Sequence, residues 1–181
     1  GAILPGGHTP DGAYWFDYSN GGFMTGSYYT DKLPEWVRSF NESNHAGKYL
    51  PAKWETLKPI ETYLESREDN YTYEASITDD LPVFPYDLKK ALKNGKNQNE
   101  LFVETPFANT FLTDFAIAAL ENEGMGKDDI TDFLAVSFSS TDYVGHTFGP
   151  RSVELQDTYL RLDQNIDQFL NYLDKTVGKD N

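Results

Sequence analysis

The chain has 181 residues, of which 39% are hydrophobic and 15% aromatic, enough to bury a sizeable core in one domain or in one domain with an appendage. Acidic residues outnumber basic ones by 29 to 15, and the net charge of −14 argues against nucleic-acid and anionic-membrane partners. The absence of cysteine excludes disulfides and cysteine-ligated zinc, and no apolar run is long enough for a transmembrane helix. An anionic substrate would need a strong local positive charge, such as a metal ion.

Residues 1–105 are expected to form loops, a hairpin and short amphipathic pieces, with the character of a cap inserted into a larger fold. Residues 1–12 are rich in Gly and Pro and indicate a loop, and the aromatic runs on either side of "YSNGG" predict a β-hairpin. Asp31 is a candidate N-cap for a helix whose apolar positions, up to Phe40, share one face. The remainder of this region has many prolines and polar turns.

Residues 106–181 have the alternating helix and strand pattern of an α/β core. A helix is predicted over "PFANTFLTDFAIAALENEGMG", with Gly124 as its stop. "FLAVSF", residues 133–138, is short and β-favouring, as in a parallel strand buried on both faces, and "SSTDYVGHTFG" is expected to be the loop after it. A long helix over 151–176 would carry an apolar stripe from Leu155 to Leu173. The sequence therefore predicts an α/β fold with part of a sheet covered by helices.

Asp142 and His146 lie four residues apart at the carboxyl end of the predicted strand, where α/β folds bind ligands. A carboxylate and an imidazole suit Zn²⁺, and a helical turn or a folded loop would bring both to one centre. Two polar residues on an ordinary loop are the alternative, since this spacing also occurs by chance. The other histidines, His8 and His45, lie in loop-like sequence and favour structural or solvent-exposed roles.

Several other polar residues have a structural interpretation beside a functional one. Asp163 and Asp167 could share acid–base chemistry, but a solvated helix face is the simpler interpretation. Asn109 could be a cap, a turn residue or a contact near a site, and we favour structure. Ser139 to Thr141 could hold a nucleophile, although no GxSxG elbow is present. The aromatic residues within 14–73 could form a ligand surface or fill a small core, and "YSNGG" needs no role beyond the turn.

The stretch "VSFSSTDYVGHTFGPRSVELQDTYLRLD" resembles the catalytic core of the alkaline phosphatase superfamily. The resemblance is to its type I phosphodiesterase/nucleotide pyrophosphatase-like branch, and within it to bacterial secreted alkaline phosphatases with a threonine nucleophile. "ILPGGHTPDGAYWFD", "YYTDKLPEWVRSFN" and "NELFVETPFANTFLTDFA" are similar to the same group. The resemblance implies a periplasmic or secreted enzyme with two zinc ions that hydrolyses phosphate esters of small molecules through a phosphothreonine. It also implies that Asp142 and His146 ligate one zinc together with a more distant histidine.

Much of the family's catalytic machinery has no counterpart in this sequence. The nucleophile and a Lys-x-Arg pair belong before Gly1, and the remaining Asp-His pair and final histidine belong after Asn181. The chain starts at Gly1 without a signal-peptide pattern, so we expect an internal segment, inactive by itself, with a cut sheet whose exposed edge favours a dimer. A phosphodiesterase or nucleotide pyrophosphatase, a related mutase or sulfatase, and a non-enzymatic binding module with an aromatic surface stay open as alternatives.

Overall fold

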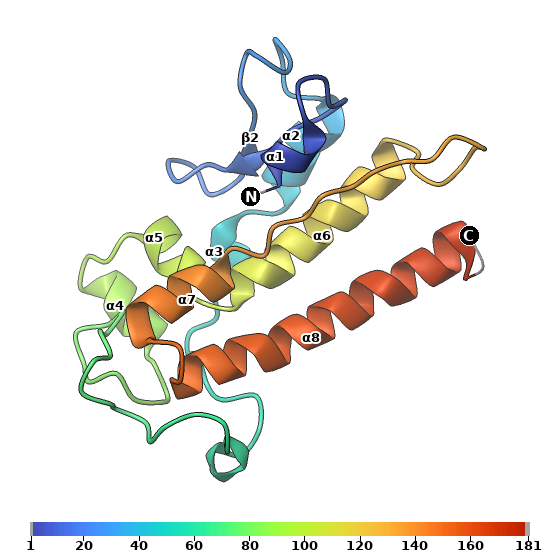
Figure 1. The fold of residues 1–181 in the computed structure, drawn as a ribbon. Helices are drawn as coiled ribbons and strands as arrows, with labels where there is room; N and C mark the ends of the chain where they lie inside the picture. The colour runs from blue at the N-terminus through green and yellow to red at the C-terminus, as the bar shows by residue number, and fades with distance from the viewer. Residues whose placement is uncertain (1, 180–181) are drawn as a thin grey trace.

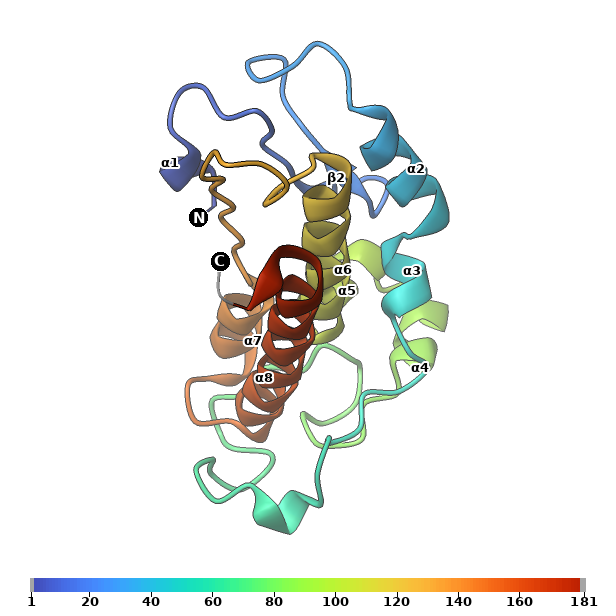
Figure 2. The ribbon, with the colours of Figure 1, turned by 90° about the vertical axis from the view of Figure 1, so that its right-hand side faces the viewer.

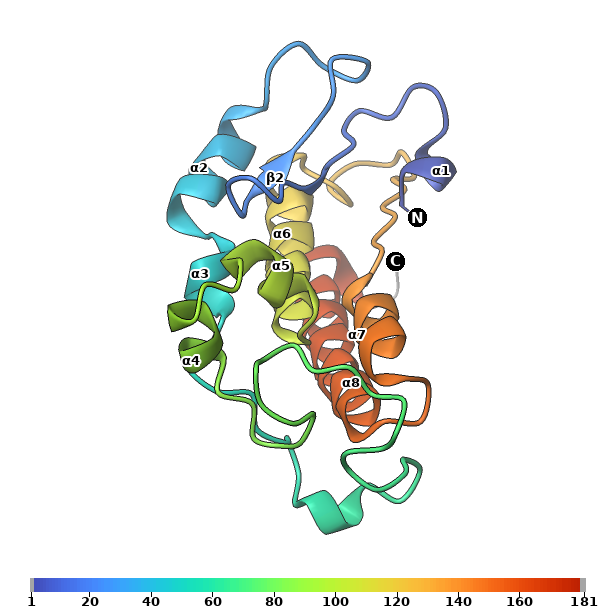
Figure 3. The same ribbon diagram turned by 90° about the vertical axis from the view of Figure 1, so that its left-hand side faces the viewer.

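Helices dominate residues 2–179, which are the residues described by this computed structural model (Figure 1). In chain order the elements are α1 (Ile3–Gly6), β1 (Trp15–Phe16), β2 (Phe23–Met24), α2 (Glu35–Ser43), α3 (Ala46–Tyr49), η1 (Ile60–Thr62), α4 (Leu88–Lys93), α5 (Gln98–Val103), α6 (Phe107–Asn122), α7 (Ser140–Phe148), α8 (Val153–Leu173) and η2 (Asp174–Gly178). The segment between α3 and α4 runs below the junction of α7 and α8 (Figure 3).

The predicted hairpin is confirmed. Strands β1 and β2 pair antiparallel, with Trp15 opposite Met24 and Phe16 opposite Phe23. Its turn is closed from within, because the Asp17 carboxylate accepts hydrogen bonds from the Ser19 amide at 2.8 Å and from the Asn20 side chain at 2.7 Å. These two strands form the only sheet found within residues 2–179.

Two helix predictions differ in outcome. Helix α6 ends at Asn122, just before Gly124 with its positive φ of 67°, so the predicted helix and its glycine stop are confirmed. The predicted cap at Asp31 is wrong, since α2 begins at Glu35 after Pro34. Pro34 disfavours a helical backbone conformation at the residue before it, Leu33, and the helix therefore does not start earlier.

The buried strand predicted at 133–138 is not formed within the described part of the chain. The segment is extended but pairs with no strand there, and the Phe133 side chain is 71% exposed. A strand needs a neighbour for its backbone hydrogen bonds, and residues 2–179 offer none at this position. The loop predicted after it is instead the helix α7, which ends at Phe148, just before Gly149 with its positive φ of 96°.

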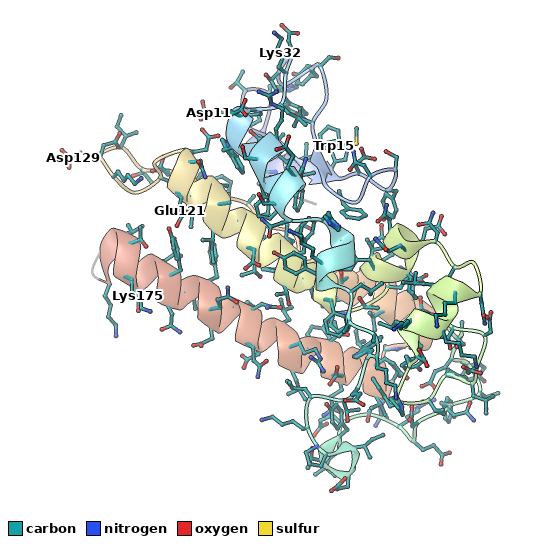
Figure 4. All side chains as sticks on the ribbon, turned by 180° about the vertical axis from the view of Figure 1, so that it is seen from behind. Asp11, Trp15, Lys32, Glu121, Asp129 and Lys175 are labelled. Atoms are coloured by element: carbon teal, nitrogen blue, oxygen red, sulfur yellow. The ribbon has the colours of Figure 1, made fainter. Side chains whose placement is uncertain are left out.

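Helices α6 and α7 both pack against α8 (Figure 1, Figure 2). Helix α8 begins where predicted, with Ser152 accepting a hydrogen bond from the Leu155 amide at 3.1 Å. Polar side chains connect it to α6, among them Tyr172, which donates to Glu121 at 2.8 Å. Glu121 lies near the end of α6 (Figure 4). Part of the predicted apolar stripe is exposed, with Ile166 at 41% and Leu170 at 54%.

The hydrophobic core consists of two clusters. One lies under α7 and the start of α8 and contains Trp54, Ile77, Tyr86, Leu88, Ala91, Leu101, Val144, Phe148 and Leu155. The other surrounds α6 and contains Phe23, Val37, Phe40, Ala46, Phe102, Val103, Phe111 and Phe115. Both clusters draw residues from either side of residue 105, so the expected cap region and the expected core region pack directly on each other.

Candidate metal-binding site

Asp142 and His146 share one face of α7. Asp142 stands in the first turn of this helix and His146 in the last, and His146 Nε2 lies 3.5 Å from Asp142 Oδ1. Both side chains are largely exposed, at 76% for Asp142 and 79% for His146. Of the two arrangements that the sequence left open, the structure has the helical turn. The i,i+4 spacing on a helix brings the two side chains together, and a contact this exposed contributes little to stability.

The sequence of α7 determines which face carries the pair. Val144 and Phe148, also four residues apart, are fully or almost fully buried against Trp54 and Leu155. Because the apolar pair fixes one face inward, Asp142 and His146 are held on a face that points to solvent.

The donor atoms of this pair fit a zinc ion in both chemistry and spacing. Carboxylate oxygen and imidazole nitrogen are normal zinc ligands, and two donors on one tetrahedral zinc, each bound at about 2.0–2.1 Å, lie about 3.4 Å apart. The observed separation of 3.5 Å is close to that value. A tetrahedral site needs three or four ligands, however, and no group of three or more His, Asp or Glu side chains in residues 2–179 could hold a metal.

The remaining histidines lie elsewhere. His8 Nδ1 is 3.2 Å from the Tyr28 hydroxyl in the N-terminal loops, and His45 directly precedes the short helix α3. Neither joins the pair on α7 in a metal-capable group within the described residues. Asp142 and His146 are thus the candidate ligand pair that the described residues bring together.

Tyr143, next to Asp142, contacts a distant part of the chain. Its hydroxyl lies 2.7 Å from the hydroxyl of Tyr18, which is in the hairpin turn 125 residues earlier. Burial, followed by the hydrogen bond to Tyr143, raises the pKa of Tyr18, so Tyr18 keeps its proton in alkaline solution. No local sequence pattern indicates this contact, and the sequence analysis missed it.

A cavity of about 330 Å³ adjoins the same helix. Its lining includes Thr147, which follows His146, together with polar side chains from the region of α5, namely Lys96, Asn97, Glu100 and Glu104. Burial raises the pKa of the Glu104 carboxyl, with Lys96 opposing the shift. The cavity offers both hydrogen-bond donors and acceptors to a small polar group.

The buried carboxylates of α8 are not the two that the sequence suggested as candidates. Asp163 and Asp167 are exposed, as the structural interpretation expected, whereas Glu154 and Asp157 are fully buried. Asp157 accepts hydrogen bonds from Trp54 Nε1 at 2.8 Å and from Arg161 Nε at 2.7 Å, and further ones from the Leu57 amide and the Tyr63 hydroxyl. The i,i+4 spacing of Asp157 and Arg161 was the available sequence signal.

The remaining candidates have local or structural roles. Asn109 lies inside α6 rather than at its cap and is buried, and its side-chain amide has no hydrogen-bond partner in the described residues. The Ser139 hydroxyl is 3.2 Å from that of Ser137, and Thr141 donates to the Phe138 carbonyl at 2.8 Å. Of the aromatic side chains within residues 14–73, Phe23, Phe40 and Trp54 are buried in the two core clusters, whereas Tyr28 and Tyr73 are exposed.

Comparison with known proteins identifies a family and two related phosphatases. Residues 11–181 match the family model described as type I phosphodiesterase/nucleotide pyrophosphatase. The chain is 50% identical over 182 residues to alkaline phosphatase PafA of Elizabethkingia meningoseptica, covering 99% of this chain and 33% of PafA. It is 49% identical over 183 residues to alkaline phosphatase PhoV of Synechococcus elongatus, covering 100% of this chain and 32% of PhoV.

The similarity to alkaline phosphatases extends from the sequence to the fold. The crystal structure of wild-type alkaline phosphatase PafA superposes with a TM-score of 0.91 at 49% identity, covering 98% of this chain and 34% of that one. The predicted fold class is confirmed at this level, as a segment of an alkaline-phosphatase-like α/β fold. The chain spans about a third of the length of the relatives it matches. By its sequence and its structure, the chain belongs to the type I phosphodiesterase/nucleotide pyrophosphatase family.

Proposed function

We propose that this chain is part of a zinc-dependent alkaline phosphatase and that Asp142 and His146 are two ligands of one of its zinc ions. The observation that carries the proposal is the pair itself: an oxygen and a nitrogen donor 3.5 Å apart on an exposed helix face. The alkaline phosphatases PafA and PhoV, each about half identical to this chain, support the choice of reaction.

Each residue has a definite part in this proposal. Asp142 supplies a carboxylate oxygen, and His146 supplies an imidazole nitrogen in its neutral form, because a protonated ring cannot ligate a metal. When bound, zinc acts as a Lewis acid toward the oxygens of a phosphate ester. The threonine nucleophile, the Lys-x-Arg pair and the other ligands of both zinc ions are expected from the parts of the longer protein outside residues 1–181.

The substrate class within this proposal is a phosphate monoester of a small molecule. Both phosphatase relatives favour it, whereas the description of the family model keeps a phosphodiester or nucleotide pyrophosphate substrate as the second candidate. A non-enzymatic binding module would have Asp142 and His146 far apart or hydrogen-bonded internally, without a response to zinc. Their short separation speaks against the first of these arrangements, and their response to zinc separates the enzyme from the second.

The place where the protein acts and its association state are also proposals. The resemblance to secreted bacterial phosphatases supports a periplasmic or secreted location, and none of the helices described is long and apolar enough to cross a membrane. Self-association is supported by the exposed apolar residues Phe133 and Leu134 in a β-favouring segment that pairs with no strand in the described chain and could pair with a second one.

Zinc titration of the 181-residue chain tests the site. The chain has three histidines, whose imidazole signals NMR spectra would follow, and we expect added zinc to shift the signal of His146 with weak affinity. Asp142→Ala should abolish the shift, and His146→Ala identifies the signal by its loss. His45→Ala serves as the matched control and should leave the zinc response of His146 unchanged. The proposed site would be contradicted if zinc did not shift the His146 signal, or if the shift were equally large in Asp142→Ala.

A further inference from the structure

The hairpin turn that carries Tyr18 is held rigidly from several sides. Asp17 caps the turn through the hydrogen bonds described above, and the Gly21 amide donates to the Asp17 carbonyl at 2.8 Å. Asn99 of α5 donates to the Tyr18 carbonyl at 2.9 Å, and the ring of Phe16 packs edge-on against the Tyr18 ring with centroids 5.2 Å apart. The turn therefore presents the Tyr18 hydroxyl at a fixed place.

The N-terminal half of α7, in contrast, is held by the burial of Ser140 and Val144 and has few hydrogen bonds to other parts of the chain. The chain that enters it, residues 131–138, is extended and without regular structure in the part of the protein described. Ser139 occupies the N-cap position without a side-chain capping bond among those residues. The other end is tied down, because Phe148 is buried and the Ala75 amide donates to the Thr147 carbonyl at 2.9 Å.

We infer that the hydrogen bond between Tyr18 and Tyr143 adds to the burial of Ser140 and Val144 in holding the first turn of α7 and that it positions Asp142 for metal binding. Within residues 2–179 it is the only side-chain hydrogen bond between α7 and a distant part of the chain. Asp142 stands in the first turn, so fraying there would move its carboxylate, while His146 near the anchored end would stay in place. Both tyrosines are positioning residues in this account and do not touch the metal.

The hairpin turn would then stabilise the first turn of α7, a role that its sequence did not indicate. An i,i+4 pair meets only while the intervening turn is helical, so the separation of Asp142 and His146 depends on that turn being formed. Partners that orient metal ligands change metal affinity markedly when they are lost. The predicted effect on zinc affinity rests on the proposed zinc site. The predicted effect on the stability of the first turn of α7 does not depend on zinc.

Hydrogen exchange in the metal-free chain tests the cause. The amides of Asp142 and Tyr143 donate to the Ser139 carbonyl at 3.1 and 3.2 Å and report on the first turn, whereas the Gly149 amide, bonded to Gly145, reports on the last. Tyr18→Phe and Tyr143→Phe should each lower the protection of the first pair by about 3- to 10-fold, the worth of one hydrogen bond. The double variant should lower it no further, because both changes remove the same bond, and Gly149 should not change.

Zinc titration of the same variants, followed at the His146 signal, tests the consequence. Each variant should bind zinc about 3- to 10-fold more weakly than Tyr159→Phe, the matched control. Tyr159 is an exposed tyrosine of α8 whose hydroxyl has no hydrogen bond in the described chain.

The outcomes separate the two proposals. A wild-type chain that binds no zinc at His146 would overturn the zinc site and the positioning role with it. A chain that binds zinc equally well with and without the tyrosine hydroxyls would overturn the positioning role alone. Unchanged amide protection in both tyrosine variants would also overturn it, whatever the zinc response.

Discussion

Glu154 shows how a single buried residue couples this fold to pH. It lies in the first turn of α8, is fully buried and accepts a hydrogen bond from the Tyr86 hydroxyl, while its second oxygen has no partner in the residues described. Burial disfavours the charged form and raises the pKa of Glu154 from 4.5 to about 7. Burial also raises the pKa values of Asp69 and Glu74, which repel the Glu154 charge.

Stability should therefore fall as the pH rises through the range of these pKa values. Below pH 4.5 Glu154 is protonated in both states, and between pH 4.5 and about 7 the folded chain binds the proton more tightly than the unfolded chain. The free energy of unfolding should decrease by about 3 kcal/mol across this range on account of Glu154, at roughly 1.4 kcal/mol per pKa unit.

Glu154→Gln should remove most of this decrease, because glutamine does not titrate. Urea unfolding of both chains between pH 4.5 and 8 is the measurement, with the exposed Glu61→Gln as control. The remaining slope would come from Asp69 and Glu74. Equal slopes for wild type and Glu154→Gln would show that the buried carboxyl does not bind its proton in the folded chain.

At the scale of elements, Asp157 joins α8 to the segment that runs below it. Its carboxylate is fully buried and accepts hydrogen bonds from Trp54, from the Tyr63 hydroxyl at 2.6 Å and from Arg161 on the next turn of α8. The proximity of this carboxylate reinforces the effect of burial, which raises the pKa of Tyr63 to about 12. Asp157 thus holds several points of the irregular segment after α3 at once, in addition to backbone hydrogen bonds such as that from the Ala75 amide to the Thr147 carbonyl.

Asp157→Ala should lower the free energy of unfolding by about 3 kcal/mol or more, since it leaves the charge of Arg161 and several buried donors without a partner. Urea denaturation monitored by tryptophan fluorescence measures the effect. Asp163→Ala, an exposed change on the same helix, should stay within about 0.5 kcal/mol of wild type. A loss for Asp157→Ala no larger than this control would show that the donors find other partners.

At the scale of the whole molecule, the chain is shorter than the phosphatases that it resembles. It covers about a third of the phosphatase PafA, and the residues described contain no metal-capable group of three or more side chains. The proposed division into a cap region, 1–105, and a core segment, 106–181, stays a prediction, because the two regions share both core clusters.

We expect no turnover of p-nitrophenyl phosphate by the isolated 181-residue chain, with or without zinc, because its proposed site lacks a nucleophile and a complete ligand set. The same assay on the longer protein is the control and should show zinc-dependent hydrolysis. Clear zinc-dependent turnover by the isolated chain, lost in Asp142→Ala, would place the catalytic residues inside it after all.

The sequence by itself determined the features that depend on near neighbours. The hairpin follows from aromatic runs around Asn-Gly-Gly, the end of α6 follows from Gly124, and the candidate ligands follow from a four-residue spacing. Contacts between distant residues were decided only by the tertiary structure, among them Tyr18 with Tyr143 and Trp54 with Asp157. The segment 133–138 shows the physical reason: its composition favours a strand, but a strand forms only where another strand lies beside it, and no local pattern contains that partner.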